Sequence, residues 1–233
     1  MEKTRVSKNR LRILYEDRWI CVVVKPAGLL SCEYPKSREK TAREVLSRHL
    51  KKDVFVVHRL DRETSGVMLF ALSAEAKKKI MDDWQKIVHE RLYRALVENP
   101  RSVSKSLPNS GRIAEPLAYN AFHRAFVPRK EDAKKFKTVS ALTDFQFILR
   151  GKTHSLVELS LETGRKNQIR AHLAFHSHPI AGDQAYRAKT DPFHRLCLHA
   201  RSLVFEHPFT NQTLSFLCEE SAAWEQFVLG KEK

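Results

Sequence analysis

The sequence predicts an α+β fold built on a mixed, mainly antiparallel sheet with flanking helices. Short apolar runs bounded by turn residues outnumber helical patterns, which favours strands as the main element. The helical patterns fall between these runs without a regular strand–helix–strand alternation. The 233 residues are 42% hydrophobic and contain no internal repeat or linker, so we expect a single domain over residues 1–233.

Two strands, a helix and a third strand are expected first. Residues 11–30 read as two strands joined by a turn, and the second strand ends at Pro26 and Gly28. Thr41, with Glu44 three residues later, forms a capping-box pattern that predicts a helix over 41–50. The apolar run 54–60 predicts the next strand.

A strand, a long helix and another strand complete the first half of the chain. The apolar run 66–72 predicts a strand. Residues 73–90 predict a helix with Ser73 as its N-cap and Ile80 and Trp84 on its apolar face. A strand follows over 92–99.

The second half of the chain begins with its least regular part. Residues 100–140 contain four prolines and the basic segment 129–137, so we expect a loop-rich insertion with short strands. Beyond it we expect a hairpin, a helix ending before a proline, a second hairpin, and a C-terminal helix capped by Ser221. These elements cover residues 142–163, 167–178, 202–219 and 221–230.

The charge balance predicts a polyanionic partner. The formal net charge is +15 and the sequence pI is about 9.8, which favours nucleic acid, although a basic scaffold would show the same balance. The four cysteines form no C-x-x-C pair and read as buried free thiols. The basic N-terminal extension 1–10 precedes no apolar signal segment, and no apolar run reaches membrane-spanning length. We therefore expect a soluble, cytoplasmic protein.

A dense group of charges separates two apolar runs in the stretch VVHRLDRETSG, residues 56–66. Asp61 stands between Arg59 and Arg62, and neighbouring arginines favour the ionised form of a carboxylate. An ionised, positioned carboxylate can be a nucleophile or a base, but a structural salt bridge explains the pattern equally well. Thr64, Ser65 and Gly66 predict a tight turn.

A second polar stretch, residues 163–183, surrounds the predicted helix at 167–178. Arg165 and Lys166 lie at the helix start, where they can meet phosphates, and Arg170 can pair with a carboxylate from elsewhere. Three histidines, at 172, 176 and 178, suggest either a metal site or a helix-surface set facing RNA or solvent. No H-E-x-x-H pattern is present, so we favour the second interpretation.

Tyr93 lies inside an apolar strand pattern. Its ring can pack in the core, or it can stack on a nucleic-acid base.

Taken together, the motifs resemble those of the RluA-type pseudouridine synthases. VKPAGLL, HRLDRETSG, LYRALV, TGRKNQIRAHL, HPIAGDQAY and RLCLHA occur in the family's order, and the resemblance runs from about residue 12 to 217. It implies the pseudouridine synthase fold with a central active-site cleft, and an isomerase that converts uridine to pseudouridine in structured rRNA or tRNA. It implies no metal and no organic cofactor.

The resemblance also implies roles for individual residues. Asp61 matches the catalytic aspartate, Tyr93 the tyrosine that stacks on the target base, and Arg170 the arginine that pairs with the aspartate. Leu198 matches an apolar position lining the pocket. The remaining substrate-binding candidates are Arg59, which we expect to fill the place of the flipped base, and Arg62, Arg165, Lys166 and Asn167.

Three departures from the family pattern stand out. Asn167 replaces a frequent histidine and cannot titrate, and Arg187 replaces a frequent glycine. Many relatives carry an S4 RNA-binding domain before the catalytic domain, whereas this chain starts almost directly at the catalytic domain. We therefore expect the catalytic domain to bind RNA itself, with basic residues of 100–140 contacting phosphates.

We expect the synthase to be a monomer that needs neither a membrane nor a metal. Two alternative functions from other classes compete with this interpretation. One is a catalytically idle RNA-binding or assembly factor on the same fold, against which the intact Asp61, Tyr93 and Arg170 argue. The other is a metal-dependent hydrolase that uses the histidines.

Overall fold

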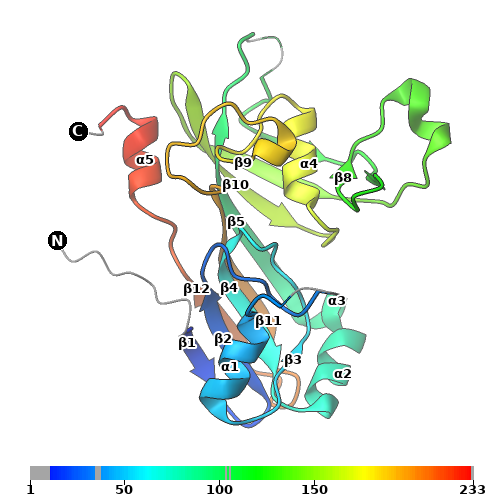
Figure 1. Cartoon of the computed structure of the whole chain (residues 1–233), viewed down its shortest axis with the longest axis vertical. Helices are drawn as coiled ribbons and strands as arrows, with labels where there is room; N and C mark the ends of the chain where they lie inside the picture. The colour runs from blue at the N-terminus through cyan, green and yellow to red at the C-terminus, as the bar shows by residue number, and fades with distance from the viewer. Residues whose placement is uncertain (1–10, 35–37, 103, 105, 232–233) are drawn as a thin grey trace. The chain divides into compact units, whose positions relative to one another are not determined.

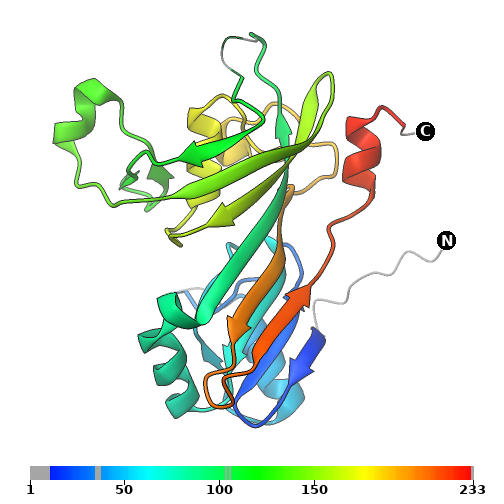
Figure 2. The ribbon, with the colours of Figure 1, turned by 180° about the vertical axis from the view of Figure 1, so that it is seen from behind.

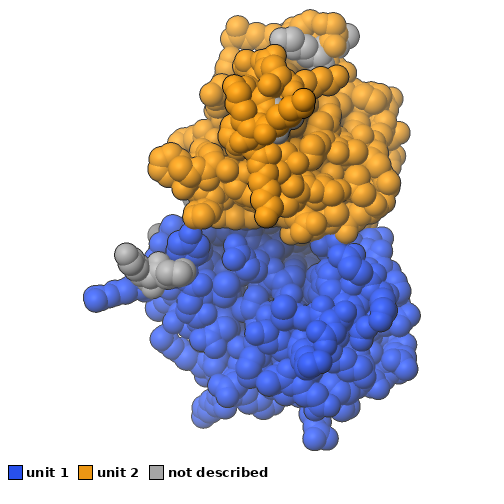
Figure 3. Space-filling model, turned by 90° about the vertical axis from the view of Figure 1, so that its right-hand side faces the viewer, with its two compact units in different colours: residues 1–91, 199–219 blue, residues 92–198, 220–233 orange. Residues whose placement is uncertain are grey.

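The computed structural model describes residues 11–34, 38–102, 104 and 106–231, so the predicted N-terminal extension lies outside the described residues. The chain forms two compact units (Figure 3). Unit 1 comprises residues 1–91 and 199–219, and unit 2 comprises residues 92–198 and 220–233. The expected single domain over the whole chain stays a prediction.

Unit 1 is built on a mixed sheet with the strand order β1-β2-β4-β11 (Figure 1). Strand β12 adds to β11 and β3 adds to β4. The β4–β11 pair is parallel, whereas β1–β2, β2–β4, β3–β4 and β11–β12 are antiparallel, which agrees with the predicted mixed, mainly antiparallel sheet. The strands are β1 (Arg12–Glu16), β2 (Ile20–Lys25), β3 (Phe55–Val56), β4 (Ser65–Ala71), β11 (Leu198–Glu206) and β12 (Thr213–Leu217).

Helix α1 (Ala42–Leu50) confirms the capping-box prediction. The hydroxyl of Thr41 accepts from the Glu44 amide at 3.1 Å, and the Glu44 carboxylate accepts from the Thr41 amide at 3.0 Å. The helix lies in front of the strands of unit 1 in Figure 1 and behind them in Figure 2, so it covers one face of the sheet.

The helix predicted over 73–90 is shorter than expected. Ser73 caps α2 (Ala74–Asp82) as predicted, but a break at Asp83 separates it from the single turn α3 (Trp84–Ile87). Strand β5 (Val88–Glu98) then begins, four residues before the predicted start at 92. The chain turns at Asp83, and β-branched residues such as Val88 favour extended backbone over helix. The apolar face is nevertheless real, since Ile80 is fully buried in the core of unit 1.

Unit 2 is built on an antiparallel sheet with the strand order β5-β10-β9-β6. The predicted hairpin is confirmed as β9 (Thr143–Arg150) and β10 (His154–Leu161). The 100–140 region is loop-rich with short elements, as predicted. These are β6 (Ser110–Ile113), the separate pair β7 (Ala118–Tyr119) and β8 (Ala125–Phe126), and the 3₁₀ helix η2 (Lys130–Lys135).

Two helices pack against the unit 2 sheet, and both are shorter than predicted. Helix α4 (Gln168–Phe175) ends three residues before the predicted His178, because the chain leaves the helix at Ser177, whose φ is +64°. Helix α5 (Ala223–Val228) has Ala222 rather than Ser221 at its N-cap, and the Ser221 hydroxyl accepts from the Ala223 amide only at 3.4 Å. The 3₁₀ turn η3 (Gln184–Tyr186) lies between α4 and β11.

The cysteines are free thiols, as predicted, but only Cys21 and Cys197 are buried; Cys32 and Cys218 are partly exposed, which corrects the expectation that all four are buried. Burial raises the pKa of Cys21 and of Cys197 to about 12, so both thiols are protonated at neutral pH. Among the described residues, no helix is both long enough and apolar enough to cross a membrane.

The expected turn at residues 64–66 lies three residues earlier. The Thr64 amide donates to the Asp61 carbonyl at 3.1 Å, so the turn covers 61–64, and Ser65 already belongs to β4. Gly66 serves a different purpose. Its φ is +122°, and a Cβ there would lie 2.1 Å from the carbonyl oxygen of Ala200 on β11. Glycine is therefore required where β4 approaches β11.

We predict that Gly66→Ala abolishes stable folding. The added methyl group must displace the backbone of β11 and occupy an unfavourable backbone conformation, which together cost at least about 3 kcal/mol. Urea denaturation followed by circular dichroism measures this loss. Gly230→Ala is the matched control, because its φ is +67° but a Cβ there meets nothing within 4 Å. Equal stability of the two variants would contradict the close-approach explanation.

Candidate functional site

A buried lysine anchors the loop that carries Asp61. The Lys25 side chain is fully buried at the end of β2, and its ammonium donates to three backbone carbonyls. Two belong to its own loop, Pro26 at 3.0 Å and Leu29 at 2.7 Å, and the third belongs to Arg62 at 3.0 Å. The Gly28 amide donates to the same Arg62 carbonyl at 2.9 Å. The residue after Asp61 is thus held by two hydrogen bonds, one from the Lys25 side chain and one from the Gly28 amide.

The residue before Asp61 is fixed by a buried serine. The Ser31 hydroxyl donates to the Leu60 carbonyl at 2.7 Å and accepts from the Leu60 amide at 3.1 Å. With the turn bond from Thr64 to the Asp61 carbonyl, the backbone is held on both sides of the carboxylate. Lys25 and Gly28 lie in VKPAGLL and Ser31 directly follows it, so this stretch supplies the groups that hold HRLDRETSG.

His58 has a structural role in this motif. Its Nε2 accepts a hydrogen bond from the Leu69 amide at 2.9 Å, so that nitrogen carries no proton. Its ring packs on Trp84 with 5.1 Å between centroids. Burial, with a smaller contribution from the charge of Arg91, lowers the pKa of His58 to about 3. The imidazole is therefore neutral at physiological pH and ties residue 58 to β4.

The arginines on either side of Asp61 lie at the surface. Arg59 is exposed. Arg62 forms ion pairs with Glu39 at 3.0 Å and with Glu63 at 3.4 Å, so the salt-bridge interpretation of this segment holds for Arg62. These side chains are about half exposed. Exposed ion pairs contribute little free energy of folding, so exchanging a glutamate partner of Arg62 for an RNA phosphate costs little. Contacts of Arg59 and Arg62 with RNA stay predictions.

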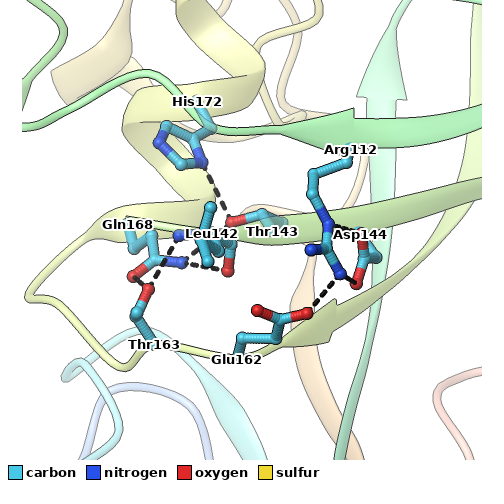
Figure 4. Close-up of polar contacts among 8 residues, drawn as sticks. All are labelled: Arg112, Leu142, Thr143, Asp144, Glu162, Thr163, Gln168 and His172. Atoms are coloured by element: carbon cyan, nitrogen blue, oxygen red, sulfur yellow. Dashed lines mark hydrogen bonds and ion pairs between the residues drawn. The ribbon is translucent and has the colours of Figure 1, made fainter. Parts of the chain in front are cut away.

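In unit 2, Gln168 ties the start of α4 to the β9–β10 hairpin (Figure 4). Its Oε1 accepts from the Thr163 hydroxyl at 2.8 Å and from the Arg165 amide at 3.0 Å. Its Nε2 donates to the Leu142 carbonyl and to the Thr143 hydroxyl, both at 2.9 Å. The buried amide thus uses both its donors and both its acceptor positions.

His172 is fully buried one turn further along α4, which corrects the expectation of a histidine facing RNA or solvent. Its Nε2 lies 3.0 Å from the Glu115 carbonyl, which can only accept, so Nε2 carries the proton. Its Nδ1 then accepts from the Thr143 hydroxyl at 2.9 Å (Figure 4). Burial lowers the pKa of His172, which keeps this neutral tautomer.

His178 is also buried, outside the helix, and burial lowers its pKa to about 4. Its Nε2 accepts from the Leu107 amide at 3.2 Å and its Nδ1 donates to the Glu98 carbonyl at 3.2 Å. His176 instead lies near Glu115, with Nε2 3.1 Å from a carboxylate oxygen. In the described part of the chain, no group of three or more His, Cys, Asp or Glu could hold a metal. His172 and His178 have both ring nitrogens engaged within the protein, so the structure gives the metal-hydrolase alternative no support.

Arg170 is held by residues that the sequence analysis did not single out. Its Nε and Nη2 donate to the two carboxylate oxygens of Asp183 at 2.7 and 2.8 Å. Its guanidinium carbon lies 5.0 Å from the ring centroid of Tyr186. Both partners belong to the HPIAGDQAY motif. The sequence indicated that this motif matches the family, but it did not predict a contact with Arg170.

The other candidates of unit 2 occupy varied environments. Tyr93 is partly buried and packs against the core cluster that contains Leu198, whose exposed fraction is 4%. Arg165 is exposed, with its Nε donating to the Ser140 carbonyl at 3.1 Å, and Lys166 is partly buried. Both precede α4 rather than lying within it.

Two of the departures from the family pattern share one backbone feature. Asn167 and Arg187 both adopt the left-handed conformation, with φ of +54° and +66°. Asparagine tolerates this conformation better than most side chains, whereas arginine is strained in it. The frequent glycine at the second position is thereby explained as a conformational preference.

The predicted site residues divide between the two units. Arg59, Asp61 and Arg62 belong to unit 1, whereas Tyr93, Arg165, Lys166, Asn167, Arg170 and Leu198 belong to unit 2. The pairing of Arg170 with Asp61 and the meeting of all these side chains at one substrate stay predictions.

Comparisons with known proteins point to one family. Residues 20–175 match the sequence profile described as RNA pseudouridylate synthase. A tRNA pseudouridine synthase C of Vibrio parahaemolyticus is 31% identical over 229 residues, covering 93% of each chain. A ribosomal large subunit pseudouridine synthase D of Neisseria meningitidis is 33% identical over 223 residues, covering 88% of this chain and 57% of that protein.

Among solved structures, human RNA pseudouridylate synthase domain containing 1 has a similar fold. The TM-score is 0.74 at 22% identity, and the match covers 100% of this chain and 89% of that one.

The depressed pKa of His58 generates a prediction about stability. Between about pH 3 and 6.5 the unfolded state binds a proton at this residue that the folded state does not, so stability falls as the pH decreases. His58→Gln keeps an acceptor for the Leu69 amide but cannot titrate. We expect urea denaturation between pH 4 and 6 to show a slope of unfolding free energy smaller by about 1.4 kcal/mol per pH unit in the variant. An unchanged slope would mean that His58 is protonated in the folded protein.

Proposed function

Because the chain belongs to the RNA pseudouridylate synthase family, we propose that it isomerises uridine to pseudouridine in structured RNA, with Asp61 as its catalytic carboxylate. The observation that carries this proposal is the fixation of the Asp61 backbone. Leu60 is bound by Ser31, and Arg62 is bound by Lys25 and Gly28. A carboxylate held in this way is positioned for chemistry at one atom of a bound nucleotide.

The reaction breaks the N1–C1′ bond, turns the uracil, and forms a C5–C1′ bond. C5 then loses its proton to the medium and N1 takes one up, so the product is an isomer of the substrate. Retaining glycosidases cleave a comparable bond with a carboxylate close to the anomeric carbon. One carboxylate suffices here because uracil is a stabilised leaving anion and no water takes part. Asp61 attacks C1′, attacks C6 of the base, or removes the C2′ proton, and all three routes need the same positioned carboxylate.

In this proposal Tyr93 and Leu198 wall the pocket that holds the detached uracil. Tyr93 offers a ring that is partly buried at the edge of the unit 2 core, and Leu198 is part of that core. Arg170 pairs with Asp61 and places a positive charge beside it. The fixed orientation of Arg170 on Asp183 supports this role.

Arg59 is proposed to occupy the place that the target base leaves. Flipping a base out of its stack costs a few kcal/mol, so a side chain that fills the vacated place favours the flipped state. Arg59 is exposed and lies two residues before Asp61. Unchanged binding and turnover of a folded stem-loop by Arg59→Ala would exclude this role.

The RNA is proposed to be transfer or ribosomal RNA, since the similar proteins carry names of both kinds. Mapping pseudouridines in both RNA classes, from cells with and without the gene, identifies the site. Phosphate contacts are assigned to Arg165, Lys166 and the exposed basic side chains of the 100–140 insertion. The latter include Arg129, Lys130, Lys134 and Lys137.

Removing three of these charges should weaken RNA binding and flatten its salt dependence. For Lys130→Ala/Lys134→Ala/Lys137→Ala we expect the slope of log K against log salt concentration to decrease by roughly 0.7–0.9 for each phosphate that the variant no longer neutralises. Fluorescence anisotropy over a salt series measures both quantities. A variant with the same charge change on α2 and α3, Lys78→Ala/Lys79→Ala/Lys86→Ala, is the comparison. Equal effects of the two variants would argue against a specific role of the insertion.

We predict that Asp61→Asn abolishes turnover while leaving RNA affinity nearly intact. Asparagine has the same shape, and the backbone bonds that hold the loop do not involve the side chain. The measurement is tritium release from RNA containing 5-tritiated uridine, together with the dissociation constant of the same RNA.

Glu63→Gln is the matched control, because Glu63 is an acid two residues away that lies at the surface and pairs with Arg62. It should release tritium at the wild-type rate. Tritium release by Asp61→Asn at the wild-type rate would refute the assignment, and absence of release by the wild-type protein would favour the idle RNA-binding alternative.

A further inference from the structure

We propose that Asp183 is a positioning residue for the isomerisation, acting through Arg170. The inference rests on the proposed function, in which Arg170 pairs with the catalytic carboxylate. It adds a second carboxylate that orients the arginine and touches no substrate atom.

The Arg170–Asp183 contact fixes an orientation as well as a distance. Both carboxylate oxygens are used, with Nε to Oδ2 at 2.7 Å and Nη2 to Oδ1 at 2.8 Å. Two parallel hydrogen bonds between planar groups hold the guanidinium against rotation, which a single contact to a lysine ammonium would not do. One edge of the guanidinium is thereby occupied, and the direction of its remaining N–H groups is set.

The burial of the pair favours a functional role over a purely stabilising one. The Asp183 side chain is 1% exposed and that of Arg170 is 14% exposed. Buried ion pairs often contribute no more stability than apolar side chains of similar volume, because both charges must lose their hydration. Stability alone is therefore a weak reason for a charged pair at this place. A cation that has to be held in one orientation beside a reacting carboxylate, in contrast, needs a second carboxylate as its partner.

Tyr186 bounds the guanidinium on another side. The Arg170 guanidinium carbon lies 5.0 Å from the centre of the Tyr186 ring. The Tyr186 hydroxyl donates to the Ala125 carbonyl of β8 at 2.7 Å, so the ring cannot turn away freely. Asp183 and Tyr186 together form a holder for the arginine side chain.

The loop that carries Asp183 is itself anchored independently of Arg170. Gly182 has a φ of +80°, and a Cβ there would lie 2.0 Å from the Arg195 carbonyl oxygen, so the two backbone segments are in close contact. The Glu98 carboxylate accepts from the amides of Lys189 and Thr190 at 2.7 and 2.6 Å. Asp183 is therefore a fixed point against which Arg170 is oriented.

The test uses the isosteric variant Asp183→Asn of the full chain. An asparagine offers one acceptor and turns its amide group towards the guanidinium, so the two parallel hydrogen bonds cannot both form. We expect single-turnover tritium release to slow roughly 10- to 100-fold. The dissociation constant of the RNA should change less than about 2-fold, because the groups assigned to phosphate binding are untouched.

Glu98→Ala is the matched control, since Glu98 holds the same loop by accepting from the amides of Lys189 and Thr190, and alanine removes that acceptor. A general loosening of the loop predicts equal slowing by both variants, and that result would overturn the proposal. Slowing confined to Asp183→Asn supports it.

A double-mutant cycle with Arg170→Ala separates action through the arginine from independent action. If Asp183 acts only through Arg170, the double variant Arg170→Ala/Asp183→Ala has the same rate as Arg170→Ala. A double variant slower by a further 10-fold or more would overturn the proposal. This comparison also serves if Asp183→Asn does not fold, because the double variant leaves neither charge unpaired.

Failure of this inference is distinct from failure of the proposed function. An active wild-type protein with a fully active Asp183→Asn variant would refute the role of Asp183 alone. A wild-type protein without tritium release would refute both.

Discussion

The proposed site depends on the hydrogen bonds that the Lys25 ammonium donates to three backbone carbonyls. A buried charge is costly unless it is fully hydrogen-bonded, and this one meets three carbonyls within 3.0 Å. One of these carbonyls belongs to the residue that follows Asp61 and two belong to the loop after β2. Separating the two loops would leave the buried charge without some of its hydrogen-bond acceptors, so the folded protein keeps the loops together. This contact fixes the position of the Asp61 backbone.

Many residues of the motifs hold the backbone in place and are not proposed to contact the substrate. On α4, Gln168 and His172 are four residues apart and face the β9–β10 hairpin, where both bind Thr143. Arg170 lies between them in sequence and therefore on another side of the helix, where Asp183 receives it. One helix thus uses one face for anchoring and another for presenting a cation. In unit 1, His58 binds the Leu69 amide, and Ser65 shares a 2.7 Å hydrogen bond with His199.

The fold was largely predictable because its signals are local. Alternating apolar residues, the capping box at Thr41 and the proline-rich insertion each act over a few residues, and the structure agrees with them. The predictions failed where distant contacts decide. The strand β5 starts at Val88, inside a helical pattern, because that segment pairs with other strands of the sheet. His172 is buried because Thr143 and Glu115 offer partners that no spacing reveals. Asp183 was missed for the same reason, since it meets Arg170 through tertiary contact from a loop outside the helix.

The most direct test measures, in one variant, both how firmly the Asp61 loop is held and how fast the protein isomerises uridine. Lys25→Met keeps the length of the side chain and removes the ammonium, which leaves three carbonyls without that donor. Amide hydrogen exchange at Gly28 and Thr64 and single-turnover tritium release should be measured on the same folded sample. We predict faster exchange at both amides and tritium release slowed roughly 10-fold or more, with RNA affinity unchanged. Faster exchange with a wild-type rate would contradict the claim that the fixed Asp61 backbone is what makes the site active.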